Sequence, residues 1–342
     1  MYMEIIDHVV ETDTFLHTEV QYIEALLKIF KIKAECVNYQ KMDNYFFFDL
    51  RLLSNTKVKD LNKYLDEISL ALKTSGKPLI KILHEEGLVR LEFVSPQINL
   101  LKLFNYLHSS PNGELMCLLG KDINGKPVWM DLIKNPHMII AGTTGSGKST
   151  LLHNIIANLL IHENILLCLL DPKNIEFANY NNIHNICIGY SYTDAIVVLD
   201  SLLSSMEYRY SLLRKGISIN NLPYGVLIID EFADLIMQDE NNQFYDKLCK
   251  LAQKCRAAKM SIILSTQRPS CNVINGTIKA NFPARIACRT ASHIDSRIIL
   301  DANGAENLFG KGDALLKDNF NSLKRFQIAY TDSEEVCKYF GN

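Results

Sequence analysis

The residues of this chain whose types and spacing point most directly to chemistry lie in one glycine-rich loop. The loop reads GTTGSGKST and fits the pattern G-x-x-x-x-G-K-[ST] in full. In a loop of this kind the backbone N–H groups turn inward around the phosphates of a nucleotide at the start of a helix. The lysine brings a point charge to the terminal phosphates, and the serine hydroxyl can ligate Mg²⁺. The predicted phosphate-binding residues are Gly142, Thr143, Thr144, Gly145, Ser146, Gly147, Lys148, Ser149 and Thr150.

The segments on either side of the loop agree with this interpretation. A strand-like apolar run, HMIIAG, precedes it, and TLLHNIIANLLI, which has the pattern of an amphipathic helix, follows it. The alternative is a glycine turn that matches the pattern by chance. We favour a phosphate-binding loop because strand, loop and helix occur in the order that such a site requires.

Two acidic residues, Asp230 and Glu231, end another apolar run in GVLIIDEFADL. At the carboxyl edge of a sheet, beside the phosphate loop, Asp230 can hold Mg²⁺ through water. Glu231 is then placed to act as the general base on an attacking water. The alternative is a pair of acids at a helix N-terminus, which such helices favour. The position of the pair, about 80 residues after the phosphate loop, favours the catalytic interpretation.

A further run, SIILSTQRPS, places Thr266 and Gln267 at the end of the next apolar segment. A neutral amide at that sheet edge can contact the γ-phosphate and report whether it is present. An ordinary strand end is the alternative, and position alone does not decide between the two.

The elements that must position these residues are strand-like runs separated by amphipathic segments. HMIIAG, NILLCLLD, GVLIID and MSIILSTQ are apolar on both faces, which is typical of a parallel sheet covered by helices. The fold class predicted for residues 109–342 is therefore an α/β P-loop NTPase domain.

The earlier part of the chain has a different pattern. Apolar residues have helical spacing at 20–33 and alternate at 44–53, and a helical segment and two strands hinged near Gly87 follow. We expect residues 1–108 to form a small α+β domain, with the aromatic run Phe46 to Phe48 in its core. Asn124-Gly125 gives a strong hairpin signal just after the boundary.

Composition limits the possible classes of protein. The 342 residues are 48% hydrophobic and 22% charged, and 36 basic residues face 38 acidic ones, so any nucleic-acid site must be local. The nine cysteines include no C-x-x-C pair, which favours reduced thiols over a zinc site or disulfide framework. No apolar run approaches the ~20 residues of a membrane-spanning helix. We therefore expect a cytoplasmic chain without a membrane segment.

These motifs together resemble the FtsK/SpoIIIE-type DNA translocases. The resemblance is strong from about 110 to 318 and rests on PHMIIAGTTGSGKST, DPKNIEF, LIIDEFADLIM, LAQKCRAAKMSIILSTQRPS, IKANFPARIA and SHIDSRIILDANGAENLFGKGDAL. It implies a RecA-like motor domain that binds ATP and Mg²⁺ and assembles as a homo-oligomeric ring, with six subunits expected, on double-stranded DNA. Residues 1–108 resemble the small α domain of these motors more loosely.

The resemblance also assigns roles to basic residues. Arg256 matches an arginine that completes the ATP site of the neighbouring subunit, and a solvated surface arginine is the alternative. Arg268, Lys279 and Arg297 match segments that grip the DNA backbone, and inter-subunit ion pairs are the alternative for each. His293 stands where related motors often carry lysine, which implies a weaker grip.

Neither the membrane-spanning segments nor the winged-helix domain of chromosome-segregating members is expected in this chain, which favours a motor encoded by a plasmid, phage or integrative element. Two other functions stay open, because protein-export ATPases share the fold and because a nucleotide-dependent adaptor in DNA transfer or replication could use the same loop. The segments TQRPS and DSRIILD favour DNA, and the intact Lys148, Asp230 and Glu231 argue against a non-hydrolysing adaptor.

Overall fold

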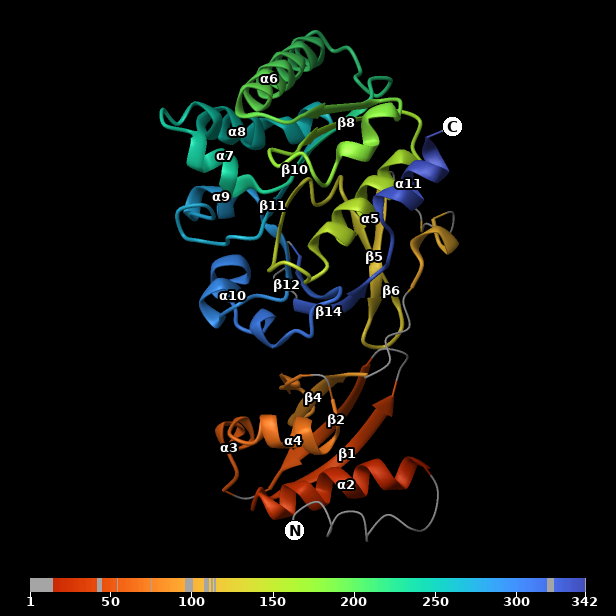
Figure 1. Cartoon of the computed structure of the whole chain (residues 1–342), viewed down its shortest axis with the longest axis vertical. Helices are drawn as coiled ribbons and strands as arrows, with labels where there is room; N and C mark the ends of the chain where they lie inside the picture. The colour runs from red at the N-terminus through yellow and green to blue at the C-terminus, as the bar shows by residue number, and fades with distance from the viewer. Residues whose placement is uncertain are drawn as a thin grey trace. The chain divides into compact units, whose positions relative to one another are not determined.

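The computed structural model of the chain describes residues 15–41, 45–53, 55–74, 76–95, 101–107, 111, 113, 115–318 and 323–341. The chain divides into two compact units (Figure 1), one formed by Met1–Asn99 with Ile123–Gly125 and the other by Leu100–Asp122 and Lys126–Asn342. The predicted boundary between residues 108 and 109 lies outside the described residues. Within the described parts, no helix has the length and apolar character that a membrane crossing requires.

The smaller unit is a four-stranded antiparallel sheet, in the order β1-β2-β4-β3, with helices packed on it. The predicted core role of the aromatic run is confirmed, because Phe46 and Phe48 are buried and pack on Phe93 of β4, Phe46 by stacking and Phe48 edge to face. Strand β1 was not predicted, because most of its residues are exposed and the partly buried ones, Ala34, Cys36 and Tyr39, do not alternate regularly. Its elements are α2 (Phe15–Ile29), β1 (Ala34–Lys41), β2 (Tyr45–Leu52), α3 (Val58–Asn62), α4 (Leu65–Ala71), β3 (Leu79–Leu83) and β4 (Leu88–Val94).

The larger unit is built on one ten-stranded sheet in the order β6-β5-β14-β13-β12-β7-β11-β10-β8-β9. The six strands from β12 to β9 are parallel, which confirms the predicted parallel sheet. The other four extend it as an antiparallel flank, of which the sequence pattern predicted only one hairpin. The strands are β5 (Met116–Asp122), β6 (Pro127–Asp131), β7 (His137–Ala141), β8 (Ile165–Leu170), β9 (Ile186–Gly189), β10 (Tyr224–Ile229), β11 (Met260–Thr266), β12 (Ala284–Cys288), β13 (Asp313–Lys317) and β14 (Leu323–Ile328). The hairpin predicted at Asn124-Gly125 is the β5–β6 connection.

Helices cover the sheet, with α11 packed beside α5 and α8 in contact with α6, α7 and α9 (Figure 1). The α-helices are α5 (Lys148–Leu160), α6 (Tyr192–Arg214), α7 (Phe232–Gln238), α8 (Gln243–Lys254), α9 (Gly276–Asn281), α10 (His293–Leu300) and α11 (Ser333–Phe340). Short 3₁₀ turns are η1 (Leu103–Asn105), η2 (Ala178–Asn182), η3 (Cys255–Ala258) and η4 (Ala305–Asn307).

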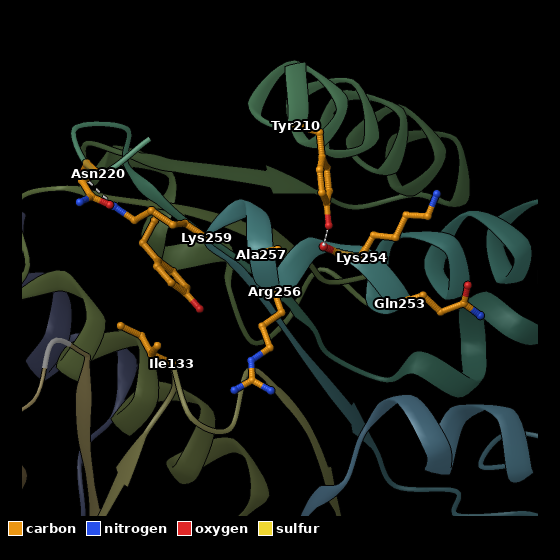
Figure 2. Close-up of a pocket in the computed structure, with 9 residues that line it drawn as sticks. Ile133, Tyr210, Asn220, Gln253, Lys254, Arg256, Ala257 and Lys259 are labelled. Carbon is orange, nitrogen blue, oxygen red and sulfur yellow. Dashed lines mark hydrogen bonds between the residues drawn. The ribbon is translucent and has the colours of Figure 1, made fainter. Parts of the chain in front are cut away.

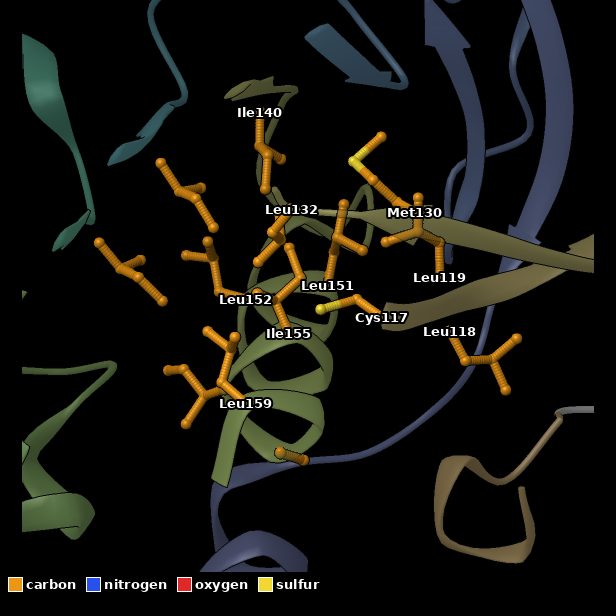
Figure 3. Packing of buried hydrophobic residues seen from close by; sticks show 14 of the residues in the cluster. Cys117, Leu118, Leu119, Met130, Leu132, Ile140, Leu151, Leu152, Ile155 and Leu159 are labelled. Carbon is orange, nitrogen blue, oxygen red and sulfur yellow. The ribbon is translucent and has the colours of Figure 1, made fainter. Parts of the chain in front are cut away.

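Helix α5, which follows the phosphate loop, lies in the centre of the main core. Its side chains Leu151, Ile155 and Leu159 pack against Cys117 of β5 and Ile140 of β7 (Figure 3). Alternate residues of a strand face opposite sides of the sheet, so this cluster lies on one face only. The burial of these apolar side chains stabilises the position of α5 on the sheet, and with it the phosphate loop at the start of the helix.

The prediction that α5 is amphipathic was wrong, because every residue from 151 to 159 is buried. Its polar side chains instead satisfy neighbouring backbone groups. Asn158 Oδ1 accepts a hydrogen bond from Leu118 N at 3.0 Å, and Asn154 Nδ2 donates to Ala329 O at 3.1 Å. Amides that are hydrogen-bonded in this way are tolerated in a core. In the sequence, however, they look like the polar face of an amphipathic helix.

Candidate nucleotide-binding site

The phosphate loop connects the carboxyl end of β7 to α5 and is held by both neighbouring strands. Gly142 N donates to Thr266 O of β11 at 3.3 Å, and Thr143 N donates to Arg289 O, just after β12, at 2.9 Å. Gly147 has a φ of +106°, and a Cβ there would lie 2.6 Å from the backbone of Gly312. Only glycine fits this position, because both its backbone conformation and the close approach exclude a side chain.

Lys148 and Asp230, which the sequence placed in one site, are in direct contact. Lys148 Nζ donates to Asp230 Oδ1 at 2.5 Å and to Ser265 Oγ at 2.8 Å, and both charged side chains are buried. A buried lysine and carboxylate each cost free energy unless they are paired, so the contact fixes both at the sheet edge. The lysine is thereby held at the start of α5, where the loop would receive phosphate.

Ser149, the other predicted magnesium ligand, has a different partner. Its hydroxyl donates to Glu176 Oε1 at 2.6 Å. No group of three or more His, Cys, Asp or Glu among the described residues could form a metal site. Mg²⁺ does not require such a group, because it is usually held by one or two protein oxygens together with water and substrate phosphates. The hydroxyl of Ser149 and the carboxylate of Asp230 are the hard oxygen donors that this ion prefers.

Glu231 is fully buried and has a φ of +51°, which is rare for a residue with a side chain. Its carboxylate accepts the hydroxyl of Thr266 at 2.7 Å and the backbone N–H of Gln267 at 3.2 Å. Lys173 Nζ lies 3.4 Å from Glu231 Oε2. These donors at the end of β11, together with the unusual backbone, fix the direction in which the carboxylate points.

Gln267 links that strand end to the phosphate loop. Its side-chain oxygen accepts the hydroxyl of Thr144 at 2.8 Å, while its N–H binds Glu231. One residue therefore contacts the loop with its side chain and the acidic residue with its backbone. The predicted proximity of Gln267 to the phosphate loop is present in the structure, and its role as a sensor stays a prediction.

Arg256 lies at the opposite edge of the sheet. It belongs to η3, just before β11 begins, whereas Gln267 follows the end of that strand. The seven residues of β11 separate the two ends by about 20 Å. Arg256 is exposed, and no hydrogen bond or ion pair of its guanidinium occurs within the described residues.

The Arg256 guanidinium enters a cavity of about 710 Å³ between η3 and the loops near it. Figure 2 shows it extending from η3 on the side away from Tyr210. Tyr210 and Lys259 are already engaged there, since Tyr210 donates to Lys254 O at 2.8 Å and Lys259 Nζ donates to Asn220 O at 2.9 Å. The structure therefore does not bring Arg256 together with the phosphate loop of its own chain.

The three predicted DNA contacts lie on the segments after β11 and β12. Arg268 and Arg297 are exposed, and Arg297 Nε donates to Asn303 Oδ1 at 2.8 Å. Lys279 forms an ion pair with Asp301 at 2.8 Å. Arg285 and Lys317 contact the same carboxylate. Burial opposes ionisation of Asp301, but these three cations hold its pKa well below the usual value.

Sequence reasoning assigned no role to two charged residues of the site, Lys173 and Glu176. Both belong to DPKNIEF, which served only as part of the family resemblance. The signal that could have found them is the position of this segment directly after β8, at the same sheet edge as Asp230. No regular spacing in the sequence relates a loop side chain to its partner, so the residues that Lys173 and Glu176 contact could not be predicted.

A parallel sheet with a glycine loop between β7 and α5, and with Lys148 at the start of α5 paired with Asp230 after β10, defines a P-loop nucleoside triphosphatase domain. The FtsK/SpoIIIE family model matches residues 107–220 and 213–271. The chain is 33% identical to DNA translocase FtsK of Treponema pallidum (strain Nichols) over 92% of its length. It is 35% identical to DNA translocase FtsK of Clostridium tetani (strain Massachusetts / E88) over 93%. Residues 107–271 therefore form a domain of the FtsK/SpoIIIE family.

The chain spans less than half of these relatives, covering 43% of the Treponema protein and 46% of the Clostridium protein. Among solved structures, the pCW3 conjugation coupling protein TcpA with ATPgS is similar with a TM-score of 0.67 at 22% identity, over 93% of this chain and 98% of that one. The cytoplasmic domain of the Type VII secretion ATPase EccC of Thermomonospora curvata has a TM-score of 0.61 at 22% identity, over 71% of this chain and 34% of that one. Both likenesses support the α/β fold.

Proposed function

We propose that this chain is a motor ATPase that moves double-stranded DNA. The observation that carries the proposal is the direct contact of Lys148 with Asp230 beside Glu231, at the edge where the phosphate loop meets the end of β11. This arrangement supplies a phosphate-binding charge, a magnesium-binding carboxylate and a general base within one site. The relatives named DNA translocase support DNA as the substrate.

Each residue of the site has a separate task in this proposal. Lys148 binds the terminal phosphates, and Ser149 and Asp230 would hold Mg²⁺, which neutralises the charge that develops on the phosphoryl group. Glu231 accepts a proton from the attacking water. Gln267 contacts the γ-phosphate, and the segment after β11 changes its position when the phosphate is present. Gln267 can couple the two because it binds both Thr144 of the phosphate loop and Glu231.

The proposal includes a homo-oligomeric ring, with six subunits as the expected number. Arg256 supports this part, because about 20 Å of strand separates it from the phosphate loop of its own chain. If Arg256 stabilises the transferred phosphoryl group, it acts on the nucleotide of a neighbouring subunit. A closed ring gives every subunit one such neighbour.

Arg268, Lys279 and Arg297 are the proposed contacts to DNA phosphates. Contacts of this kind give affinity without sequence preference, which a translocase requires. The ammonium of Lys279 is already paired with Asp301, so a DNA phosphate must compete with that carboxylate. We therefore expect Arg268 and Arg297 to contribute more of the grip.

The test is steady-state ATP turnover of the full chain with linear duplex DNA, single-stranded DNA, RNA or no nucleic acid. We expect duplex DNA to stimulate turnover most, and Lys148→Ala to abolish it. Equal turnover under all four conditions would contradict the translocase proposal and favour a protein-export motor. The setting on a plasmid, phage or integrative element stays a prediction, and the neighbouring genes would test it.

A further inference from the structure

The segment from Asp171 to Phe177 lies beside the candidate site and is held by hydrogen bonds to one buried carboxylate. Asp171, at the end of β8, is fully buried, and its carboxylate accepts the backbone N–H groups of Lys173 at 3.2 Å, Ile175 at 2.8 Å and Phe177 at 3.0 Å. Phe177 is itself fully buried. These contacts fix the backbone around Glu176, so the position of its side chain is set by the fold.

Glu176 lies between the phosphate loop and a buried histidine. One carboxylate oxygen accepts the hydroxyl of Ser149 at 2.6 Å, and the other lies 3.3 Å from Nε2 of His153. Nδ1 of His153 lies 2.7 Å from the hydroxyl of Tyr180. The contact with His153 is the main cause that holds the pKa of Glu176 below its usual value, with burial opposing it and Ser149 adding to it.

We propose that Glu176 is a positioning residue for the magnesium ion, acting through the hydroxyl of Ser149. This inference rests on the proposed function. The hydrogen of the Ser149 hydroxyl points at Glu176, which leaves the lone pairs of the oxygen for the metal. An outer carboxylate that accepts a hydrogen bond from a metal ligand orients that ligand and makes it a better donor.

The charges of the site support this role. Lys148 forms its ion pair with Asp230 and not with Glu176. The carboxylate of Glu176 therefore places a second negative charge next to Ser149. A divalent cation beside the hydroxyl would be favoured by that charge. His153 and Tyr180 support the carboxylate from behind. Because the Glu176 carboxylate can only accept, the proton of a neutral His153 ring lies on Nε2, which leaves Nδ1 to accept the hydroxyl of Tyr180.

The test measures binding, with no hydrolysis required. The dissociation constant of a fluorescent, non-hydrolysable ATP analogue is determined for the full chain in EDTA and in excess MgCl₂. The magnesium effect is the dissociation constant in EDTA divided by that in MgCl₂. Glu176→Ala should lower this ratio about tenfold or more, the usual range for removing an outer-shell partner, while affinity in EDTA is unchanged. Glu176→Gln, which keeps an acceptor oxygen, should restore part of it. Glu163→Gln, at an exposed position after α5, is the matched control and should leave the ratio at the wild-type value.

The outcomes separate this inference from the proposed function. A wild-type magnesium effect that survives both Glu176→Ala and Glu176→Gln would overturn the role of Glu176 and leave the nucleotide site intact. Equal loss of affinity in EDTA and in MgCl₂ would assign Glu176 a purely structural role and also overturn the inference. A wild-type chain that does not bind the analogue would refute the proposed function itself.

Discussion

The sharpest prediction concerns Arg256, because its position excludes action on the nucleotide of its own chain. It lies before β11 and the phosphate loop lies beside the far end of that strand, about 20 Å away, which is beyond the reach of one side chain. An arginine supplied by a neighbour accelerates phosphoryl transfer by roughly a thousandfold or more, equivalent to about 4 kcal/mol of transition-state stabilisation. Arg256→Ala should therefore bind ATP normally and hydrolyse almost none.

Mixing two inactive variants tests whether the arginine acts between subunits. Glu231→Gln lacks the base and keeps Arg256, whereas Arg256→Ala lacks the arginine and keeps Glu231. In a random equal mixture about a quarter of the interfaces pair an intact base with an intact arginine, so turnover should return to about that fraction of the wild-type value.

The assay is ATP turnover at saturating duplex DNA and ATP, with each variant alone and with the two mixed. Lys254→Ala, which removes a neighbouring cation of the same cavity, is the matched control for general loss of positive charge. Near-wild-type turnover of Arg256→Ala alone would show that the arginine has no chemical role. A mixture as inactive as its components, in rings of normal size, would refute action between subunits.

Three further changes test other parts of the structure. Gly147→Ala should abolish binding of a fluorescent nucleotide, because a side chain at a φ of +106° would also press on Gly312, and retained affinity would show that the loop can shift. Asp301→Asn should lower the free energy of unfolding most above about pH 5, because a carboxylate whose folded-state pKa is lowered stabilises the fold only while it is ionised. The difference from the wild-type chain should shrink as pH falls. A difference that does not change with pH in urea titrations would contradict this. Arg297→Ala should weaken duplex binding equally for all sequences and lower the slope of log K against log salt by about 0.9, with a smaller change for Lys279→Ala; loss confined to one sequence would indicate a base contact.

The central part of the fold could be predicted from the sequence because its strands are buried on both faces. Runs such as GVLIID and MSIILSTQ are continuous apolar segments between turn residues, and they form the adjacent parallel strands β10 and β11. The antiparallel flank gave no such signal. In β14, Leu323 and Lys324 are exposed, and two of the four buried residues, Arg325 and Gln327, are polar, so no continuous apolar run marks the strand.

The contacts within the site followed from the sequence only where two residues end adjacent strands. Thr266 pairs with Ala141 in the register of β11 and β7, which places Gln267 beside the phosphate loop as predicted. Glu176 lies in an irregular segment whose path depends on the buried carboxylate of Asp171. Such a path is decided by tertiary hydrogen bonds, and no periodic pattern encodes it.

The strand order has a consequence for the chain as it leaves the ribosome. Strands β5 and β7 are synthesised close together, yet in the finished sheet β14, β13 and β12 lie between them, and these begin only at Ala284. In the nascent chain the facing edge of β7 has no partner until β12 ends at Cys288, and that of β5 has none until β14 ends at Ile328; unpaired edges attract other strands. The backbone of Gly312, which donates to Ser146 O at 2.9 Å, also arrives late. We therefore expect the phosphate loop to become ordered only near the end of synthesis, and nascent chains arrested before residue 284 to require chaperones and to bind no nucleotide.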